Sequence, residues 1–294
     1  MVTVSVADLA TPVPVAALCA ILVANAVHVF LSCCKCLSGS TRIWASLVPC
    51  VVSAGSIYGV LTLVDAIDAL AAHAWWIDSA VSEAVGGLGE CASGLLDVDT
   101  PIGDVEDAAT MASSLVAAVQ GVAGPAAWAT CGTITLLWFV TGVARLNPCF
   151  GVGCCVVPPA LASGLVGVAF LAAAAWAPVL CSQGREELEA SEWFEEFVTG
   201  NSSTTEAAIT AAINALPDPD GGCLATLTRA RTMLKPGAFS VQYSDSNALL
   251  CTDIPDSIRW IGAFLSAAAC APLLVDCVML AVGWLVCVGK TVGV

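Results

Sequence analysis

Five long runs of apolar residues dominate the hydrophobic pattern of the chain. They cover approximately residues 13–31, 43–63, 126–146, 158–180 and 260–290. Each run is long enough to cross the hydrocarbon core of a bilayer, which needs about 20 residues in a helix. An odd number of crossings places the two termini on opposite sides of the membrane. The pattern therefore predicts an all-α, polytopic membrane protein with five transmembrane helices.

Two longer segments separate these spans, and apolar residues recur in both at helical spacing. We expect the two segments to form an extracellular helical bundle. The predicted order is an extracellular N-terminus, a hairpin of spans, a helical loop, a second hairpin, a second helical loop, and a fifth span with a short cytoplasmic tail. The corresponding ranges are 1–12, 13–72, 73–125, 126–181, 182–258 and 259–294.

Local signals predict where several helices begin, bend or end. Pro49 predicts a kink in the second span, and Pro125 a kink in the third span or its beginning. Asp104 is a candidate N-cap, because it follows the helix-breaking pair Pro101 and Gly103. Ser203 with Glu206 matches a capping box, which predicts a helix that ends near Pro217. Residues 236–255 carry no clear period, and we expect an irregular segment there.

Charge supports the membrane assignment and orients the chain. The sequence of 294 residues is 58% hydrophobic and only 11% charged, far from the composition of a soluble domain. Its formal net charge of −15 excludes a nucleic-acid partner, which would need a basic face. Basic residues at the span ends fall on one side if the spans alternate: Lys35, Arg42, Arg145 and Lys290. The positive-inside bias predicts that this side is cytoplasmic and that the N-terminus is outside.

Three polar residues lie inside the first and fifth spans. Asn25 and His28 are three residues apart and share one helical face, and Asp276 lies at a similar depth in the fifth span. An acid in mid-span costs about 2.5–3.5 kcal/mol, so it requires a partner or a wet cavity. One interpretation is a polar relay or ion site between the two spans. The other is an interhelical hydrogen bond that fixes helix packing, at about 0.6–2 kcal/mol.

The 16 cysteines divide between the two sides of the predicted membrane. Several lie at the inner edge, where the interpretations are reversible acylation and plain reduced thiols: Cys33, Cys34, Cys36, Cys149, Cys154 and Cys155. On the outer side we expect a disulfide between Cys223 and Cys251, which share a loop. A second disulfide between Cys91 and Cys181 would join the two loops.

Other motifs are sparse. Asn201-Ser202-Ser203 is a sequon for N-glycosylation, on the predicted outer side. Five clustered acids could bind calcium, but they lack EF-hand spacing, and a solvated acidic face is the favoured interpretation: Asp97, Asp99, Asp104, Glu106 and Asp107. The sequence has no G-x-S-x-G, phosphate loop or H-E-x-x-H motif, so we expect no enzymatic activity, no metal and no resident cofactor.

The layout resembles that of the prominin and tweety families. The resemblance rests on the cysteine-rich turn after the first span, the turn at 149–155, the sequon at Asn201, and the outer pair Cys223 and Cys251. It implies a protein of curved plasma or ciliary membrane that binds lipid or sterol and associates as a dimer or larger membrane assembly. The outer loops here are shorter than those typical of these families.

Three functions follow from these observations. The first is a non-enzymatic membrane organiser that binds lipid or sterol. The second is an ion channel or channel subunit, with Asp65 and Asp68 outside and His28 and Asp276 inside along a cation path. The third is an accessory or anchoring subunit of a larger membrane assembly. Composition alone does not separate the first function from the third.

Overall fold

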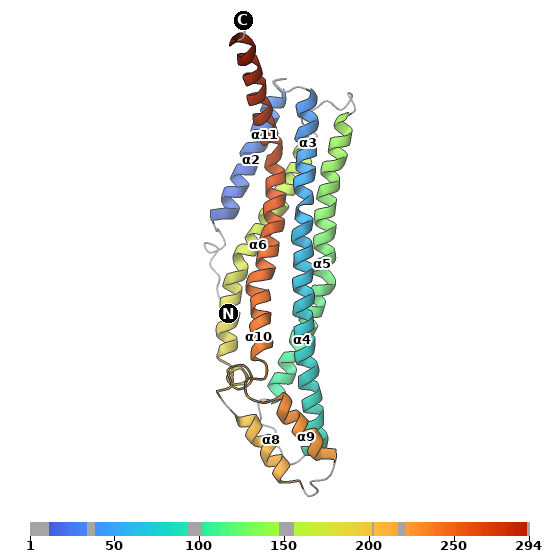
Figure 1. Ribbon diagram of the computed structural model, residues 1–294, viewed down its shortest axis with the longest axis vertical. Helices are drawn as coiled ribbons and strands as arrows, with labels where there is room; N and C mark the ends of the chain where they lie inside the picture. The colour runs from blue at the N-terminus through green and yellow to red at the C-terminus, as the bar shows by residue number, and fades with distance from the viewer. Residues whose placement is uncertain are drawn as a thin grey trace. The chain divides into compact units, whose positions relative to one another are not determined.

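A computed structural model describes residues 12–33, 39–92, 102–146, 156–201, 203–216 and 222–292, and these residues form helices without strands (Figure 1). The elements in chain order are α2 (Pro12–Cys33), α3 (Gly39–Ala54), α4 (Ser56–Ala92), α5 (Ile102–Leu146), α6 (Val157–Glu189), α7 (Glu192–Phe194), the π-helical turn η3 (Glu195–Thr199), α8 (Thr204–Asn214), α9 (Gly222–Met233), α10 (Ser240–Ala248), the π-helical turn η4 (Leu249–Asp253) and α11 (Ile254–Val292).

Among the described residues, five stretches are long and apolar enough to cross a membrane. They are 14–31, 47–91, 106–144, 157–186 and 240–285. The chain thus has the helices of an integral membrane protein, and the predicted all-α class is confirmed. The second, third and fifth stretches have 45, 39 and 46 residues. Each exceeds the roughly 20 residues that a bilayer requires, because these helices continue well beyond one crossing.

Contacts divide the chain into two compact units. The first unit comprises 1–63, 124–177 and 255–294, and the second comprises 64–123 and 178–254. The first unit contains most of the apolar spans, whereas the second contains most of both predicted loops. Several residues of α4, α5 and α6 belong to each unit, whereas α11 contributes only its first residue, Ile254, to the second unit.

The first unit is built around α11, which contacts several other helices (Figure 1). A Cβ atom built on Gly262 of α11 would lie 2.8 Å from the carbonyl oxygen of Gly167 in α6. On α6 itself, a Cβ atom at Gly164 would meet the Ile21 side chain of α2 at 2.7 Å. The small residues therefore let the helix backbones approach closely, which is typical of helices that pack in lipid.

The second span is broken in its middle. α3 ends at Ala54 and α4 begins at Ser56, and Gly55 forms the turn between them. Hydroxyl groups compensate the interrupted backbone ladder: Ser53 donates to Cys50 O at 2.9 Å, and Ser56 donates to Ser53 O at 2.6 Å. The predicted kink at Pro49 thus appears as a break six residues later, since Pro49 remains inside α3. A Cβ atom on Gly55 would lie 2.6 Å from the Phe264 ring.

α5 is one continuous helix of 45 residues, although the sequence predicts a kink or a new helix at Pro125. A helical proline removes one backbone hydrogen bond, and its ring crowds the carbonyl four residues earlier. The residue directly before the proline is Gly124, which has no Cβ atom to crowd the proline ring. We attribute the tolerance of Pro125 to this glycine.

The second unit has its own hydrophobic core. Large side chains from four of its elements meet there: Val81 and Leu88 of α4, Phe197 of η3, Ile209 of α8 and Leu227 of α9. All five are 4% exposed or less. Complete burial of such a side chain stabilises a fold by about 1.5–3 kcal/mol relative to its exposure to water. This core is therefore of the kind found in soluble helical domains.

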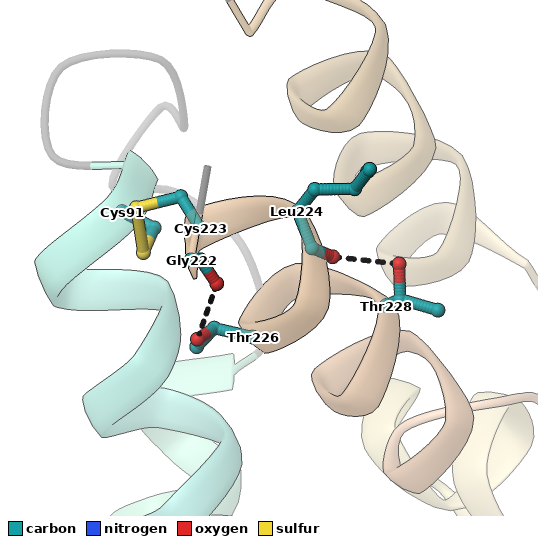
Figure 2. The surroundings of a disulfide bond; sticks show 6 residues. All are labelled: Cys91, Gly222, Cys223, Leu224, Thr226 and Thr228. Carbon is teal, nitrogen blue, oxygen red and sulfur yellow. Dashed lines mark hydrogen bonds between the residues drawn. A yellow bond between two sulfur atoms is a disulfide. The ribbon is translucent and has the colours of Figure 1, made fainter. Parts of the chain in front are cut away.

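Two disulfides close the second unit. Cys91 near the end of α4 bonds Cys223 at the start of α9, and Cys181 of α6 bonds Cys251 of η4. Figure 2 shows the first bridge beside the opening turn of α9, where the Thr226 hydroxyl donates to Gly222 O. The expected cysteines are used, but the expected pairing of Cys223 with Cys251 and of Cys91 with Cys181 is wrong. Closeness in sequence is a poor guide, because the helices of both loops pack together.

Two further local expectations need correction in the second unit. The residue at the N-cap of α8 is Ser203, but its hydroxyl forms no capping hydrogen bond. The buried Glu196 carboxylate accepts from the Thr205 backbone N–H instead, at 2.5 Å. The segment 236–255 is also largely helical, because α10 and η4 lead directly into α11. Packing of Phe239 in the core and the bridge at Cys251 order a segment that lacks periodicity of its own.

Candidate functional site

The first candidate site is the polar pair inside the first unit. His28 of α2 and Asp276 of α11 meet through Nδ1 and Oδ2 at 2.5 Å. Both side chains are buried, with side-chain exposures of 2% and 0%. Asn25, one turn earlier on α2, donates its side-chain amide to Ala269 O of α11 at 3.3 Å and to Ile21 O at 2.8 Å. The structure thus brings α2 and α11 together through His28 and Asp276, the two residues that the sequence places at a similar depth in their spans.

Some polar atoms of this group lack a hydrogen-bond partner among the described residues. These atoms are His28 Nε2, Asp276 Oδ1 and Asn25 Oδ1. An unsatisfied polar atom in an apolar interior costs about 1–3 kcal/mol, so the group is expensive for the fold. The two cross-helix hydrogen bonds offset part of that cost. Since both side chains are sealed from the surface, the geometry favours a role in holding α2 against α11.

The second candidate site is a cleft in the second unit, which we call the aromatic cleft. Its volume is about 340 Å³, within the range of small-molecule sites. α4 contributes one face of five residues, and the segment at the end of α9 supplies the rest. The lining residues are Trp75, Trp76, Ser79, Ala80, Glu83, Thr232, Met233, Lys235 and Ala238.

The walls of the aromatic cleft combine apolar surface with one free cation. Trp75 and Trp76 are 68% and 44% exposed, so much of each indole is open to a ligand. Phe239 fixes the Trp76 ring through an edge-to-face contact, with centroids 6.1 Å apart. Glu83 is paired with Arg229 at 2.8 Å. Lys235 has no ion pair within the described ranges, so its ammonium group is available to an anion.

A second groove in this unit lies between α4 and α5 and has two acids. Asp68 accepts from the Gln120 amide at 2.7 Å, and Asp78 accepts from Ser113 at 3.0 Å. The two acids are ten residues apart on one helix, which separates them by about 15 Å along its axis. The two carboxylates are therefore too far apart to bind one ion. Each of them also accepts a hydrogen bond from a side chain of α5.

The calcium interpretation finds no cluster in the described part of the chain. No group of three His, Cys, Asp or Glu side chains there is placed to hold a metal ion. Asp97 and Asp99 lie outside the described residues, as does the side chain of Asp104. Calcium binding by these acids stays a prediction.

The structure describes only some of the predicted modification sites. Asn201 is exposed between η3 and α8, where a glycan would find space. Cys33 is the last residue of α2, and the remaining candidate acylation sites lie outside the described residues: Cys34, Cys36, Cys149, Cys154 and Cys155. Glycosylation and acylation stay predictions.

Sequence reasoning missed the aromatic cleft and the buried Glu196. In the sequence alone, the Trp75-Trp76 pair is typical of an aromatic belt at a membrane–water interface. Lys235 is only one basic residue at a short predicted helix. The available signal was the spacing of 75, 76, 79, 80 and 83, which is one face of a helix. No local pattern shows that the end of α9 covers this face.

No protein-family model matches the chain, and no curated protein matches it. The resemblance to prominin and tweety proteins therefore stays a prediction from the sequence. What the fold itself defines is a class: an all-helical chain with five helices long and apolar enough to cross a membrane, and with two disulfides in its second unit.

Proposed function

We propose that this chain is a non-enzymatic membrane organiser of the prominin or tweety type, which binds a membrane lipid or sterol in the aromatic cleft. The cleft is the single observation that carries the proposal. In this assignment the second unit lies outside the cell with the N-terminus, and the C-terminus is cytoplasmic. The plasma or ciliary membrane is the proposed location.

The distribution of disulfides supports this orientation. All four cysteines of the second unit are bonded, whereas five cysteines of the first unit are free: Cys19, Cys50, Cys131, Cys270 and Cys277. Disulfides persist in oxidising compartments. An outer second unit accounts for this division.

The chemistry of the cleft selects an amphipathic ligand. Exposed indole faces, Met233, Ala80 and Ala238 favour a flat or flexible apolar body, because removal of apolar area from water gives about 25 cal/mol per Å². Lys235 favours an anionic or hydroxyl group at one end of that body. Membrane lipids and sterols combine these features, whereas a small inorganic ion would leave the indoles unused.

Photoreactive lipids test this proposal directly. The purified chain is reconstituted into vesicles that contain either a photoreactive sterol or a photoreactive fatty acid, and labelled peptides are identified by mass spectrometry. We expect labels on 75–83 and 232–238 that decrease several-fold in the Trp75→Ala variant. Trp284→Ala is the matched control, since Trp284 has a similar exposure of 66% but lies outside the cleft. Labelling confined to the spans would contradict the proposal.

A channel is the second candidate function, and the buried His28–Asp276 pair is the observation that favours it. A titratable pair inside the membrane is typical of ion and proton pathways. Bilayer recordings of the wild type and of Asp276→Asn separate the two functions. A channel predicts currents that change with the substitution, whereas the organiser predicts no current in either protein.

A further inference from the structure

The groove between α4 and α5 in the second unit is a candidate binding site separate from the aromatic cleft. Its volume is about 550 Å³, within the range of small-molecule sites. Alanines line it together with six residues that can contact a ligand through a polar or aromatic group: Asp68, Trp75, Asp78, Ser113, Ser114 and Gln120. We call this site the polar groove.

The polar groove lies on a part of α4 that faces water. Four acids lie within residues 65–83 of this helix, and none of the four is buried: Asp65, Asp68, Asp78 and Glu83. Ionised carboxylates are costly in the hydrocarbon core of a bilayer. The apolar stretch 47–91 has 45 residues, about twice what one crossing requires, so a crossing does not need the acidic part. The polar groove is therefore open to water-soluble ligands.

The two carboxylates of the polar groove are held in place by side chains of α5. Asp68 accepts from the Gln120 amide at 2.7 Å, and Asp78 accepts from the Thr110 and Ser113 hydroxyls at 3.2 and 3.0 Å. A carboxylate has about four lone-pair sites, so each acid can accept further hydrogen bonds. Neither acid forms an ion pair with another described residue, and residues 64–123 contain no Lys or Arg. Both carboxylates are thus positioned and available to a cation.

An aromatic ring lies between the two acids on the same face of α4. Trp75 follows Asp68 by seven residues and precedes Asp78 by three, which is the spacing of one helix face. Its side chain lines the polar groove and is 68% exposed. The face of an indole attracts ammonium groups through its quadrupole. Along one helix, the groove therefore presents a carboxylate, an aromatic face and a second carboxylate.

The charge of the second unit favours a cationic ligand. The unit contains 21 Asp and Glu residues but only four Lys and Arg residues. Three of those four bases already pair with a glutamate: Arg185, Arg229 and Arg231. An anion would be repelled by this unit. A neutral sugar can stack on an indole and donate hydrogen bonds to carboxylates, but it would leave both charges without compensation.

We propose that the polar groove binds a linear aliphatic polyamine. Asp68 and Asp78 are about 15 Å apart along the helix axis, so a ligand reaches both only if it carries ammonium groups at the two ends of an extended chain. The methylene groups between them lie over the alanines of the groove, and an internal ammonium group contacts the Trp75 face. This site shares only Trp75 with the aromatic cleft, and its ligand differs from the proposed lipid.

Isothermal titration calorimetry of the full chain in a non-ionic detergent tests the proposal. Spermine is the probe, and two related ligands serve as controls. Putrescine is a diamine too short to reach both acids, and spermine acetylated at both terminal amines keeps the length but loses the end charges. We expect spermine to bind at least about tenfold more tightly than either control, because only spermine engages both carboxylates at once.

Substitutions in the polar groove locate the bound spermine. Asp68→Asn and Asp78→Asn should each weaken its binding about three- to tenfold, because each removes one charge-assisted contact. Asparagine keeps an acceptor oxygen for the hydrogen bonds from α5, and thermal unfolding checks that each variant is folded. Asp65→Asn is the matched control, since it removes the same charge from an exposed residue of α4 outside the groove. Trp75→Ala should weaken binding as well, and Trp75→Phe should restore part of it.

Three outcomes overturn the proposal: no binding of spermine, equal affinities for spermine and putrescine, or an equal loss of affinity in Asp65→Asn. The last outcome would indicate a non-specific attraction to an acidic surface. Lipid labelling of the aromatic cleft can fail without any effect on spermine binding. Failure of the proposed function and failure of the polyamine site are therefore distinguishable.

Discussion

The two units stabilise their interiors by different means. In the first unit, glycines allow close contact between helix backbones, and six buried polar atoms lack a partner among the described residues: Asn25 Oδ1, His28 Nε2, Thr135 Oγ1, Trp138 Nε1, Ser266 Oγ and Asp276 Oδ1. Two such atoms, Thr205 Oγ1 and Gln242 Oε1, lie in the second unit. The second unit combines large apolar side chains, two disulfides and several ion pairs.

In the proposed placement, with the second unit outside the membrane, the difference reflects two solvents. In lipid the transfer of apolar side chains from solvent gives little, so close backbone contact and interhelical hydrogen bonds stabilise the helix bundle. In water the hydrophobic effect drives core formation, and cross-links restrict the unfolded chain. Substitutions that act on one mechanism should therefore affect one unit far more than the other.

Loss of a disulfide should have the largest effect, and only in the second unit. Replacement of Cys91 and Cys223 by serine removes a bridge between residues 132 apart in sequence. We expect a loss of about 2–5 kcal/mol in the free energy of unfolding, because the unfolded chain regains loop entropy. Thermal unfolding in detergent measures this loss. Cys277→Ser, at an exposed free thiol, is the control, and equal unfolding midpoints for both variants would contradict the prediction.

The next largest effect should come from the addition of one methyl group to the interior of the first unit. In Gly262→Ala, the new Cβ would lie 2.8 Å from Gly167 O and 2.9 Å from Leu171 N. These are backbone atoms, so α6 and α11 must separate, at about 1–3 kcal/mol. Gly283→Ala on the same helix meets no atom within 4 Å and serves as the control. The prediction is wrong if both variants unfold at the same temperature in detergent.

The buried pair should show coupling of intermediate size. We expect His28→Gln and Asp276→Asn to be non-additive by about 0.6–2 kcal/mol, the range for interhelical hydrogen bonds in membranes. A double-mutant cycle on thermal stability measures that coupling. Asp276→Asn combined with Cys19→Ala, at an exposed position, should be additive. Additivity in both cycles would show that the pair does not hold α2 to α11.

The smallest effect should come from an exposed ion pair of the second unit. Arg229 and Glu83 are 2.8 Å apart, but their side chains are 66% and 47% exposed. Surface pairs of this kind contribute about 0.2–1 kcal/mol and weaken in salt. Arg229→Gln should thus lower the unfolding temperature slightly at low ionic strength and not at high ionic strength. A large, salt-independent loss would indicate that Arg229 supports the aromatic cleft by packing.

The sequence predicts features that depend on one helix or on the bilayer. Hydrophobic run lengths define the five spans, and their alternation brings His28 and Asp276 to one depth. The sequence does not predict features that depend on how helices pack within a unit. The disulfide pairing required knowledge that α9 begins beside the end of α4, and the cleft required the position of Lys235. The close approach of the Phe264 ring to Gly55 likewise depends on helix packing, which no local pattern reveals.

The order of the four bridged cysteines has a consequence for biosynthesis. Along the chain they run Cys91, Cys181, Cys223 and Cys251, and the native bridges connect the first with the third and the second with the fourth. The bridges are interleaved, because Cys181 of the second bridge is synthesised before Cys223 completes the first bridge. A growing chain presents Cys181 to Cys91 before Cys223 exists. Oxidation during translation thus favours a non-native bridge first, and maturation depends on a thiol–disulfide exchange catalyst or on delayed oxidation.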